Sequence, residues 1–166
     1  FAPELPGTRI GFEAGAGLEE TGVVGFAGRR AVSMLRVLFR EAARPDADTL
    51  VRACLTQRGV EVFHSSQGVE GLCLLLIAKP GQDALHAACD EVRRLLPGAQ
   101  VKLRENLAAL LALCRTTREV PKLAAAMESA GVPVHHLVQT PPGALFCVND
   151  SQYETALRAA YALAFG

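Results

Sequence analysis

The stretch GVEVFHSSQ at residues 59–67 decides the fold, because a related stretch, GVPVHHLVQ, follows at residues 131–139. The offset of 72 residues also pairs Gly71 with Gly143. Farther along, the same offset aligns two runs of small and apolar residues, Ala84, Leu85, Ala87 and Ala88 with Ala156, Leu157, Ala159 and Ala160. Solenoid repeats are shorter, at up to about 50 residues, so each copy is expected to bury its own core. The sequence therefore predicts two copies of one small domain.

The composition is typical of a globular protein without a polyanionic partner. The 166 residues include 17 Lys and Arg against 17 Asp and Glu, and 50% of them are hydrophobic. This balance argues against disorder, nucleic acid and an anionic membrane. The longest apolar runs, residues 72–78 and 107–114, are far shorter than the roughly 20 residues of a membrane helix, and no signal peptide is read before them. We expect a soluble cytoplasmic protein whose partner is a small ligand or another protein.

The cysteines are odd in number, widely spaced and embedded in apolar segments: Cys54, Cys73, Cys89, Cys114 and Cys147. No CxxC motif and no paired Cys and His spacing occurs, so the pattern is not that of a metal site. We expect buried, reduced thiols, no metal and no cofactor.

The first copy is expected over residues 19–105 in the order β-α-β-β-α-β. Residues 23–26 are interpreted as a strand, residues 25–28 as a glycine turn, and the apolar spacing after them as a helix that Pro45 ends. A second helical segment makes the helical part, residues 41–56, longer than usual. Strands near residues 60–64, 72–77 and 101–103 and a helix from Asp83 complete the unit. This is a ferredoxin-like α+β fold, an antiparallel sheet with helices on one face.

The second copy is expected over residues 106–166, with strands at 107–114, 132–138 and 144–148 and helices at 118–130 and 153–165. Its final strand is missing from the sequence order. An open sheet edge invites unwanted pairing, so a strand at residues 8–13, within the N-terminal segment 1–18, is predicted to complete this unit.

No catalytic motif is present, neither a P-loop nor GxGxxG, HExxH or GxSxG. His64 and His136 occupy equivalent strand positions, and His135 points away from His136 because adjacent strand residues face opposite ways. We interpret these histidines as structural. Gln67 and Gln139 end their strands, where an amide can either bind a polar ligand or cap the strand.

A ligand site is predicted between the glycine turn and the end of the second strand. A helix N-terminus after the turn would offer free N–H groups and Arg29 to a carboxylate, although a tight turn that only needs small residues is the alternative. The candidate effector-binding residues are Gly25, Phe26, Ala27, Gly28, Arg29, Ser65, Ser66, Gln67 and Gln139.

The tandem units resemble the paired ACT domains at the C-terminus of aspartate kinases, over nearly the whole chain. The most similar residues are Glu128, Ala130, Gly131 and Val132, then Asp150, Ala156, Arg158, Ala159 and the closing Ala164, Phe165 and Gly166. In that family an N-terminal strand joins the second ACT unit. Gln67 matches the polar residue that closes the second strand of the first unit, where such proteins bind lysine or threonine as inhibitor.

The resemblance implies a regulatory region that is not itself catalytic, with an amino-acid effector, a homodimer formed through ACT units, and a kinase catalytic domain outside this chain. The family's first loop has an acidic residue before Pro-Gly, whereas residues 25–30 and 116–119 here have no such sequence. A ligand ammonium would lack a countercharge, so a neutral or acidic ligand is expected rather than lysine. The alternatives are a free-standing two-ACT sensor acting on a partner protein, and a small ferredoxin-like enzyme that uses His64 or His135.

Overall fold

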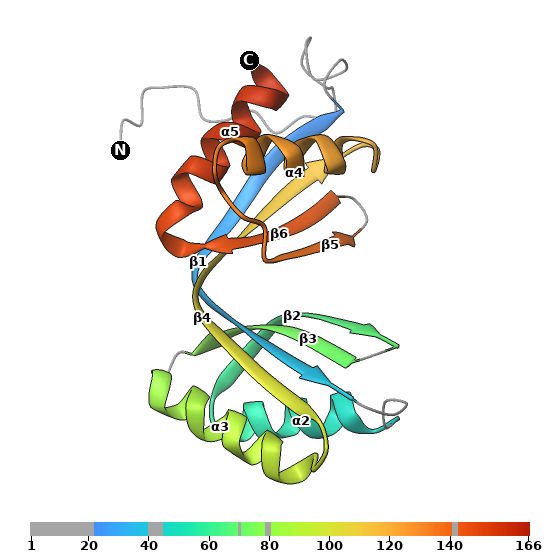
Figure 1. The fold of residues 1–166 in the computed structure, drawn as a ribbon, viewed down its shortest axis with the longest axis vertical. Coiled ribbons are helices and arrows are strands. Elements are labelled where there is room, and N and C mark those ends of the chain that lie inside the picture. The colour runs from blue at the N-terminus through green and yellow to red at the C-terminus, as the bar shows by residue number, and fades with distance from the viewer. Residues whose placement is uncertain (1–21, 40–44, 70, 79–80, 141–142) are drawn as a thin grey trace, which may run out of the picture.

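The computed structural model describes residues 22–39, 45–69, 71–78, 81–140 and 143–166 (Figure 1). Its six strands form one antiparallel sheet in the order β2-β3-β1-β4-β6-β5. The elements in chain order are β1 (Val23–Leu38), α2 (Ala47–Gln57), β2 (Val60–Gly68), β3 (Gly71–Ala78), α3 (Gln82–Leu95), β4 (Gln100–Cys114), α4 (Glu119–Ser129), β5 (His136–Thr140), β6 (Gly143–Asn149), the short 3-10 helix η1 (Asp150–Gln152) and α5 (Tyr153–Phe165).

Two long strands, β1 and β4, belong to both halves of the molecule. The second half of β1 pairs with β3 and with residues 100–104 of β4, which makes the half-sheet β2-β3-β1-β4 of the first unit. The first half of β1 pairs with residues 109–114 of β4, and β4 pairs there with β6, which makes the half-sheet β5-β6-β4-β1 of the second unit. Each unit thus has the β-α-β-β-α-β set, and the second unit takes its last strand from the start of β1.

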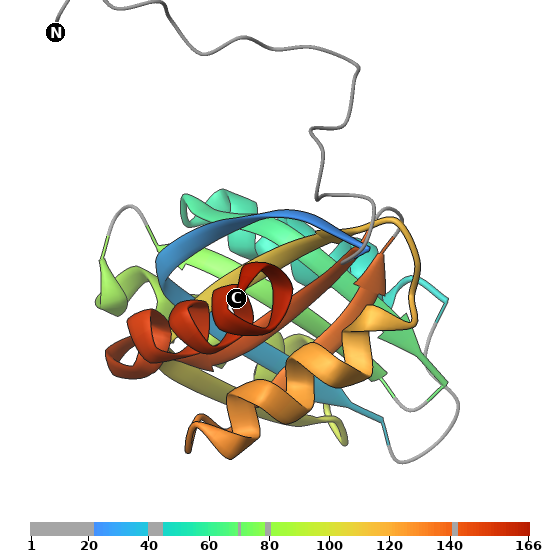
Figure 2. The same ribbon diagram turned by 90° about the horizontal axis from the view of Figure 1, so that it is seen from above.

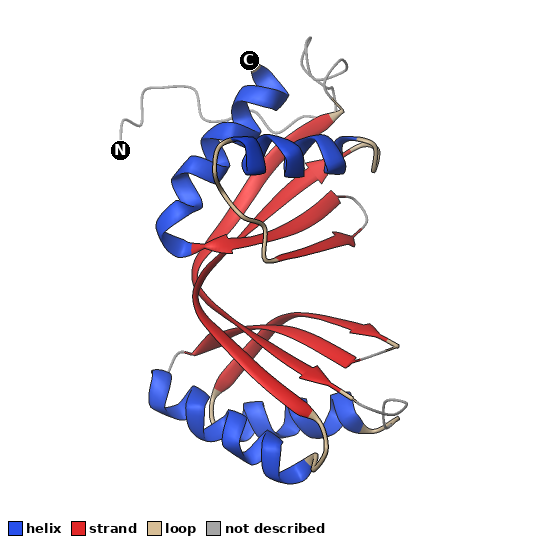
Figure 3. Cartoon of the chain, in the orientation of Figure 1, coloured by secondary structure: helices blue, strands red, loops and turns tan. Residues whose placement is uncertain are grey.

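The helices lie on the outside, and the helix-free faces of the two half-sheets turn toward each other (Figures 1 and 3). One core packs α2 and α3 onto the first half-sheet, and a second packs α4 and α5 onto the other. Figure 2 shows α4 and α5 side by side on the outer face of the second unit. A third cluster, which includes Val32, Met34, Leu75, Leu107 and Cys147, lies between the half-sheets. No helix of the described residues is long and apolar enough to cross a membrane.

The predicted α+β architecture with two ferredoxin-like units is confirmed. The last strand of the second half-sheet is the first half of β1, residues 23–29. The predicted strand at residues 8–13 lies outside the described part of the chain, so its pairing stays a prediction. The second half of β1 is the first strand of the first unit. The predicted start of the first unit at residue 19 precedes both halves of β1, so it does not separate the two half-sheets.

The predicted glycine turn at residues 25–28 and the helix after it are wrong, because β1 is one continuous strand of 16 residues. The second half of the strand is buried on both faces: Leu35 and Val37 pack under the helices, and Val32 and Met34 pack between the half-sheets. Such a strand lacks the alternation of a half-buried one, so its apolar residues also fit a helical spacing. The segment at residues 41–56 is therefore not an extra helix, since α2 is the first helix of this unit.

The repeated glycines Gly71 and Gly143 have a shared structural cause. Each begins a strand, β3 or β6, where the neighbouring backbone passes very close. A Cβ atom at Gly71 would lie 2.1 Å from the carbonyl oxygen of Val37, and one at Gly143 would lie 1.9 Å from that of Ala112. Only glycine allows this approach in either unit, which explains why the pair survives at the fixed offset.

Candidate functional site

The predicted effector-binding residues fall into separate groups. Residues 25–29 lie in β1 at the edge of the second half-sheet, paired with β4. Residues 65–67 lie in β2, the outer strand of the first half-sheet, and Gln139 lies in β5, the outer strand of the other. No helix N-terminus follows residues 25–28, so the set of free helical N–H groups expected there does not occur. One chain does not bring residues 25–29 and 65–67 together.

Gly28 has a packing role instead. A Cβ atom at this position would lie 1.8 Å from the hydroxyl oxygen of Tyr153 on α5, so glycine makes room for that ring. The guanidinium carbon of Arg30 lies 5.9 Å from the centre of the same ring, within the range of a cation–π contact. Helix-to-sheet packing therefore explains Gly28, whereas nothing lies within 4 Å of a Cβ position at Gly25.

Within β2, neighbouring residues serve different faces. Ser65 pairs with Leu74 of the helix-covered core, and its hydroxyl accepts a hydrogen bond from Arg52 of α2, which also bonds Asp48 at 2.8 Å. Gln67 shares this face and is exposed, as is Gln139 at the equivalent position of β5. Ser66 pairs with Cys73 on the opposite face. The outer edge of β2 thus offers the Gln67 amide on one side of the sheet and the Ser66 hydroxyl on the other.

A groove of about 460 Å³ lies between the two helix-free faces, and Arg36, Ser66, Cys73 and His136 line it. Ser66, Cys73 and Arg36 form a cross-strand row over β2, β3 and β1, so their side chains share one face. His136 comes from β5 of the other unit. The guanidinium of Arg36 donates a hydrogen bond of 2.9 Å to the backbone oxygen of His135 and so links the two units. Sequence reasoning missed Arg36, although a single charge in the apolar run of residues 31–39 is a signal that could have found it.

Of the two equivalent histidines, His136 lines this groove, and His64 lies on the helix-free face of β2 outside its lining. The Nε2 atoms of both rings are buried and have no hydrogen-bond partner. Burial lowers the pKa of His64, and burial together with the charges of Arg36 and His64 lowers the pKa of His136. Both rings are therefore held neutral near pH 7. His64 pairs with Leu75 and His136 with Cys147, so the two equivalent histidines stand against the same cluster between the half-sheets.

His135 has a structural role. Its Nε2 atom lies 2.8 Å from the Oδ1 atom of Asn149, whose amide nitrogen donates to Gln152. Gln152 in turn donates to the backbone oxygen of Gly131, so the chain of bonds fastens the start of β5 to η1. In the described part of the chain, no group of three or more His, Cys, Asp and Glu side chains could hold a metal ion.

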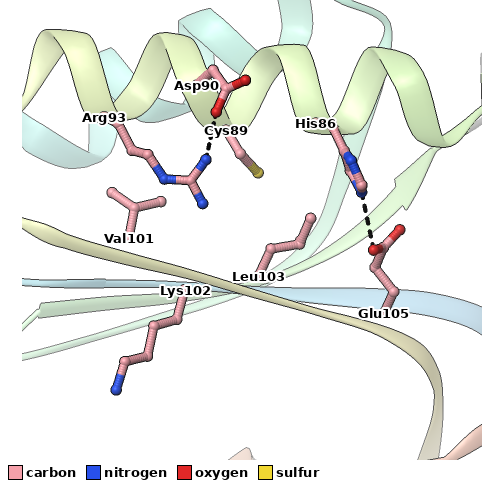
Figure 4. Close-up of a pocket in the computed structure, with 8 residues that line it drawn as sticks. All are labelled: His86, Cys89, Asp90, Arg93, Val101, Lys102, Leu103 and Glu105. Atoms are coloured by element: carbon pink, nitrogen blue, oxygen red, sulfur yellow. Dashed lines mark hydrogen bonds and ion pairs between the residues drawn. The ribbon is translucent and has the colours of Figure 1, made fainter.

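A second pocket, of about 510 Å³, lies between α3 and the first half of β4 (Figure 4). Cys89, Val101 and Leu103 give it an apolar part, while His86 on α3 reaches the Glu105 carboxylate on β4 at 3.0 Å (Figure 4). The other carboxylate oxygen of Glu105 is buried without a partner. Sequence reasoning did not single out this pocket, because its residues belong to an amphipathic helix and an alternating strand.

These features define a class of fold: two ferredoxin-like units whose half-sheets share the strands β1 and β4. The sequence matches no protein-family model and no curated protein. Among solved structures, the regulatory subunit of aspartate kinase from Thermus flavus is similar with a TM-score of 0.69 and 22% identity, over 86% of this chain and 98% of that one. The ligand-free regulatory subunit from Thermus thermophilus has a TM-score of 0.68 and 23% identity, over 87% of this chain and 99% of that one.

The aspartate kinase of Clostridium acetobutylicum has a TM-score of 0.75 and 15% identity, over 86% of this chain. The present chain spans 34% of that kinase's length. The resemblance to aspartate kinase regulatory regions is thus confirmed at the level of the fold.

Proposed function

We propose that this chain is a non-catalytic regulatory region of an aspartate kinase, which binds an amino-acid effector, mediates subunit association, or does both. The main support for this proposal is the pairing of residues 23–29 with the second half of β4. This N-terminal segment completes the second unit, as the family resemblance implies. The match over nearly the full length of two regulatory subunits also supports the proposal. We place the protein in the cytoplasm, in the biosynthesis of the aspartate family of amino acids.

The effector site is proposed at the outer strands of the two units. Gln67 on β2 and Gln139 on β5 are exposed, equivalent in the repeat and on the helix-covered faces. Ser65 and Ser66 adjoin Gln67. Residues 25–29 lie in the other unit from these serines, so a site that includes both groups needs a second copy of the chain. The absence of a carboxylate in these two groups favours a neutral or acidic amino acid over lysine.

A homodimer is also proposed, because a site that includes both groups of residues needs a second copy of the chain. The outer strands β2 and β5 each have one edge that no strand of the described chain pairs, and such edges are ready for pairing with another chain. Val24, Tyr161 and Phe165 add exposed apolar surface, at 47%, 47% and 43% of their areas. A second copy would cover both features.

A thermal-shift screen of the amino acids, followed by calorimetry, tests the effector. A ligand at 100 times its dissociation constant stabilises its protein by about 2.7 kcal/mol. Gln67→Ala should weaken the binding, and Gln57→Ala, on the exposed side of α2, should not. Tight lysine binding that ignores Gln67→Ala would place the site elsewhere.

Light scattering tests the assembly. A chain that is monomeric at tens of micromolar and that no amino acid stabilises would overturn the regulatory proposal. The alternative of a free-standing sensor is favoured by one observation, since the Thermus regulatory subunits are matched over 98% and 99% of their chains. Co-purification with a separate kinase chain would distinguish it from a region joined to its kinase.

A further inference from the structure

Positive charge gathers on the facing surfaces of the two units. Arg36 pairs across the sheet with Cys73 and Lys102, and Arg104 pairs with Met34, so these basic side chains share the helix-free face. Within the described residues, no carboxylate lies within ion-pairing distance of Arg36 or Arg104. Arg36 brings this charge into the groove, and Lys102 and Arg104 lie beside the groove on the same face of the half-sheet.

An unsatisfied imidazole nitrogen adds a second, independent observation. His136 of the second unit lines the groove, and its Nε2 atom is buried without a partner. Buried polar groups are normally hydrogen-bonded, and each exception needs an explanation. An oxygen ligand in the groove would supply the missing acceptor to a protonated Nε2 atom.

We infer that the groove between the helix-free faces binds a small anion with carboxylate or phosphate oxygens, held by Arg36 of the first unit and by His136 of the second. Its volume of about 460 Å³ lies within the usual range of small-molecule sites, about 300–1,000 Å³. The guanidinium suits planar or tetrahedral oxyanions because its donors form a fixed fork. The Ser66 hydroxyl on the same wall completes the donor set.

This site is distinct from the proposed effector site. Gln67 and Gln139 lie on the helix-covered faces, whereas Arg36 and His136 line the groove on the inner side. The anion would touch both units at once and so would fix the angle between the half-sheets. The inference does not depend on the identity of the amino-acid effector, or on whether one binds.

Binding should be tighter at pH 6 than at pH 8. Burial, followed by the charges of Arg36 and His64, lowers the pKa of His136, and an anion beside this imidazole would favour its charged form. The other groups that face it are Arg36, Arg104, His64 and the Cys73 and Cys147 thiols; burial lowers the pKa of His64 and raises the pKa values of both thiols. The His136 imidazole is therefore the group in the groove that an anion would charge in this interval.

The test uses the full chain with inorganic phosphate and with succinate, each against sodium chloride of equal ionic strength. We expect one or both anions to raise the melting temperature and to bind in calorimetry. The anion that binds more tightly shows whether the groove prefers phosphate or carboxylate oxygens. Arg36→Gln should weaken binding at least tenfold, whereas Arg93→Gln, the same change on the outer helix α3, should have no effect. Stabilisation no greater than that by sodium chloride, or equal loss in both variants, would overturn the inference.

A measurement on the unmodified protein covers the case in which Arg36→Gln does not fold. Proton and nitrogen resonances of the four histidines can be followed by NMR during the titration. His136 should shift with saturation, and His86, on the outside against Glu105, should stay unchanged. Uniform small shifts of all four rings would exclude a site in the groove.

Discussion

Ala31 and Asn106 share the left-handed backbone conformation, each with φ of 56°, at the points where β1 and β4 pass from one unit to the other. The register shifts here from Arg29 opposite Ala109 to Val32 opposite Leu107. A bulge of this kind bends a strand and increases its twist, which is how one pair of strands can serve two half-sheets. Asparagine tolerates this conformation and alanine does not, so the two crossings are unequally strained.

Ala31→Gly should therefore stabilise the protein by about 0.5–1 kcal/mol, because relief of the left-handed strain exceeds the greater flexibility of unfolded glycine. Asn106→Ala should destabilise it by about 1 kcal/mol for the opposite reason. Urea unfolding measures both. Ala27→Gly, in the regular part of β1, is the control and should lower stability. A loss of stability in Ala31→Gly would show that residue 31 is not strained.

The carboxylate of Asp150 holds the crossing of β1, since it accepts hydrogen bonds from Arg30 at 2.8 Å and from the backbone N–H of Ala31 at 3.1 Å. The Arg30 side chain, followed by that backbone bond, lowers the pKa of Asp150. The stabilisation is thus present above the unfolded pKa, near 4, and is lost as the pH falls through the lower folded value. Asp150→Asn should lower the melting temperature at pH 7 by a few degrees at most, since the pair is partly exposed. The difference from the unchanged protein should close below about pH 4; a constant difference from pH 7 to pH 3 would contradict this account.

Gly71→Ala and Gly143→Ala should each destabilise the chain by more than about 2 kcal/mol, because the added Cβ would meet a backbone carbonyl of the next strand. Gly68→Ala is the matched control in the same hairpin, since nothing lies within 4 Å of its Cβ position. Chemical denaturation of the three variants gives the comparison. Similar losses for Gly68→Ala and Gly71→Ala would mean that flexibility, rather than close approach, matters here.

The thiols should react slowly with a disulfide reagent at pH 7.5, and Cys73 should react first. Cys54, Cys89, Cys114 and Cys147 are buried, whereas Cys73 is half-buried. Burial raises the pKa of Cys89 and of Cys147 to about 11, so little thiolate forms there. Burial also raises the pKa of Cys73, but a hydrogen bond and the charge from Arg36 oppose that effect. Mass spectrometry after brief labelling would identify the site, and preferred labelling of Cys147 would contradict the packing between the half-sheets.

The sequence predicted the two units because the repeated residues have the same structural role in each unit. Gly59 and Gly131 both follow a helix with positive φ, of 72° and 76°, and Ala88 and Ala160 are fully buried in equivalent helices. The sharing of strands was predicted only in outline, from a missing element. No local pattern indicates which segment fills the gap, since pairing between β1 and β4 joins residues far apart in the chain.

The candidate site was harder to predict than the fold. Residues 25–28 have the composition of a turn, yet Gly28 is small because Tyr153 packs on it. Arg36 lies in a strand buried on both sides, where periodicity cannot assign a face. The convergence of His64 and His136 depends on the folding of one half-sheet toward the other, which the repeat alone does not specify.

Because β1 and β4 each run through both units, no single cut divides this chain into two complete halves. A fragment that starts at residue 107 would lack the strand at residues 23–29, and the remaining fragment would carry that strand without its partner. A genetic crossover at one point could not transfer either unit alone to another protein. We therefore expect evolution to gain or lose the two units together, and the two units to unfold together, although their sequences are copies of each other.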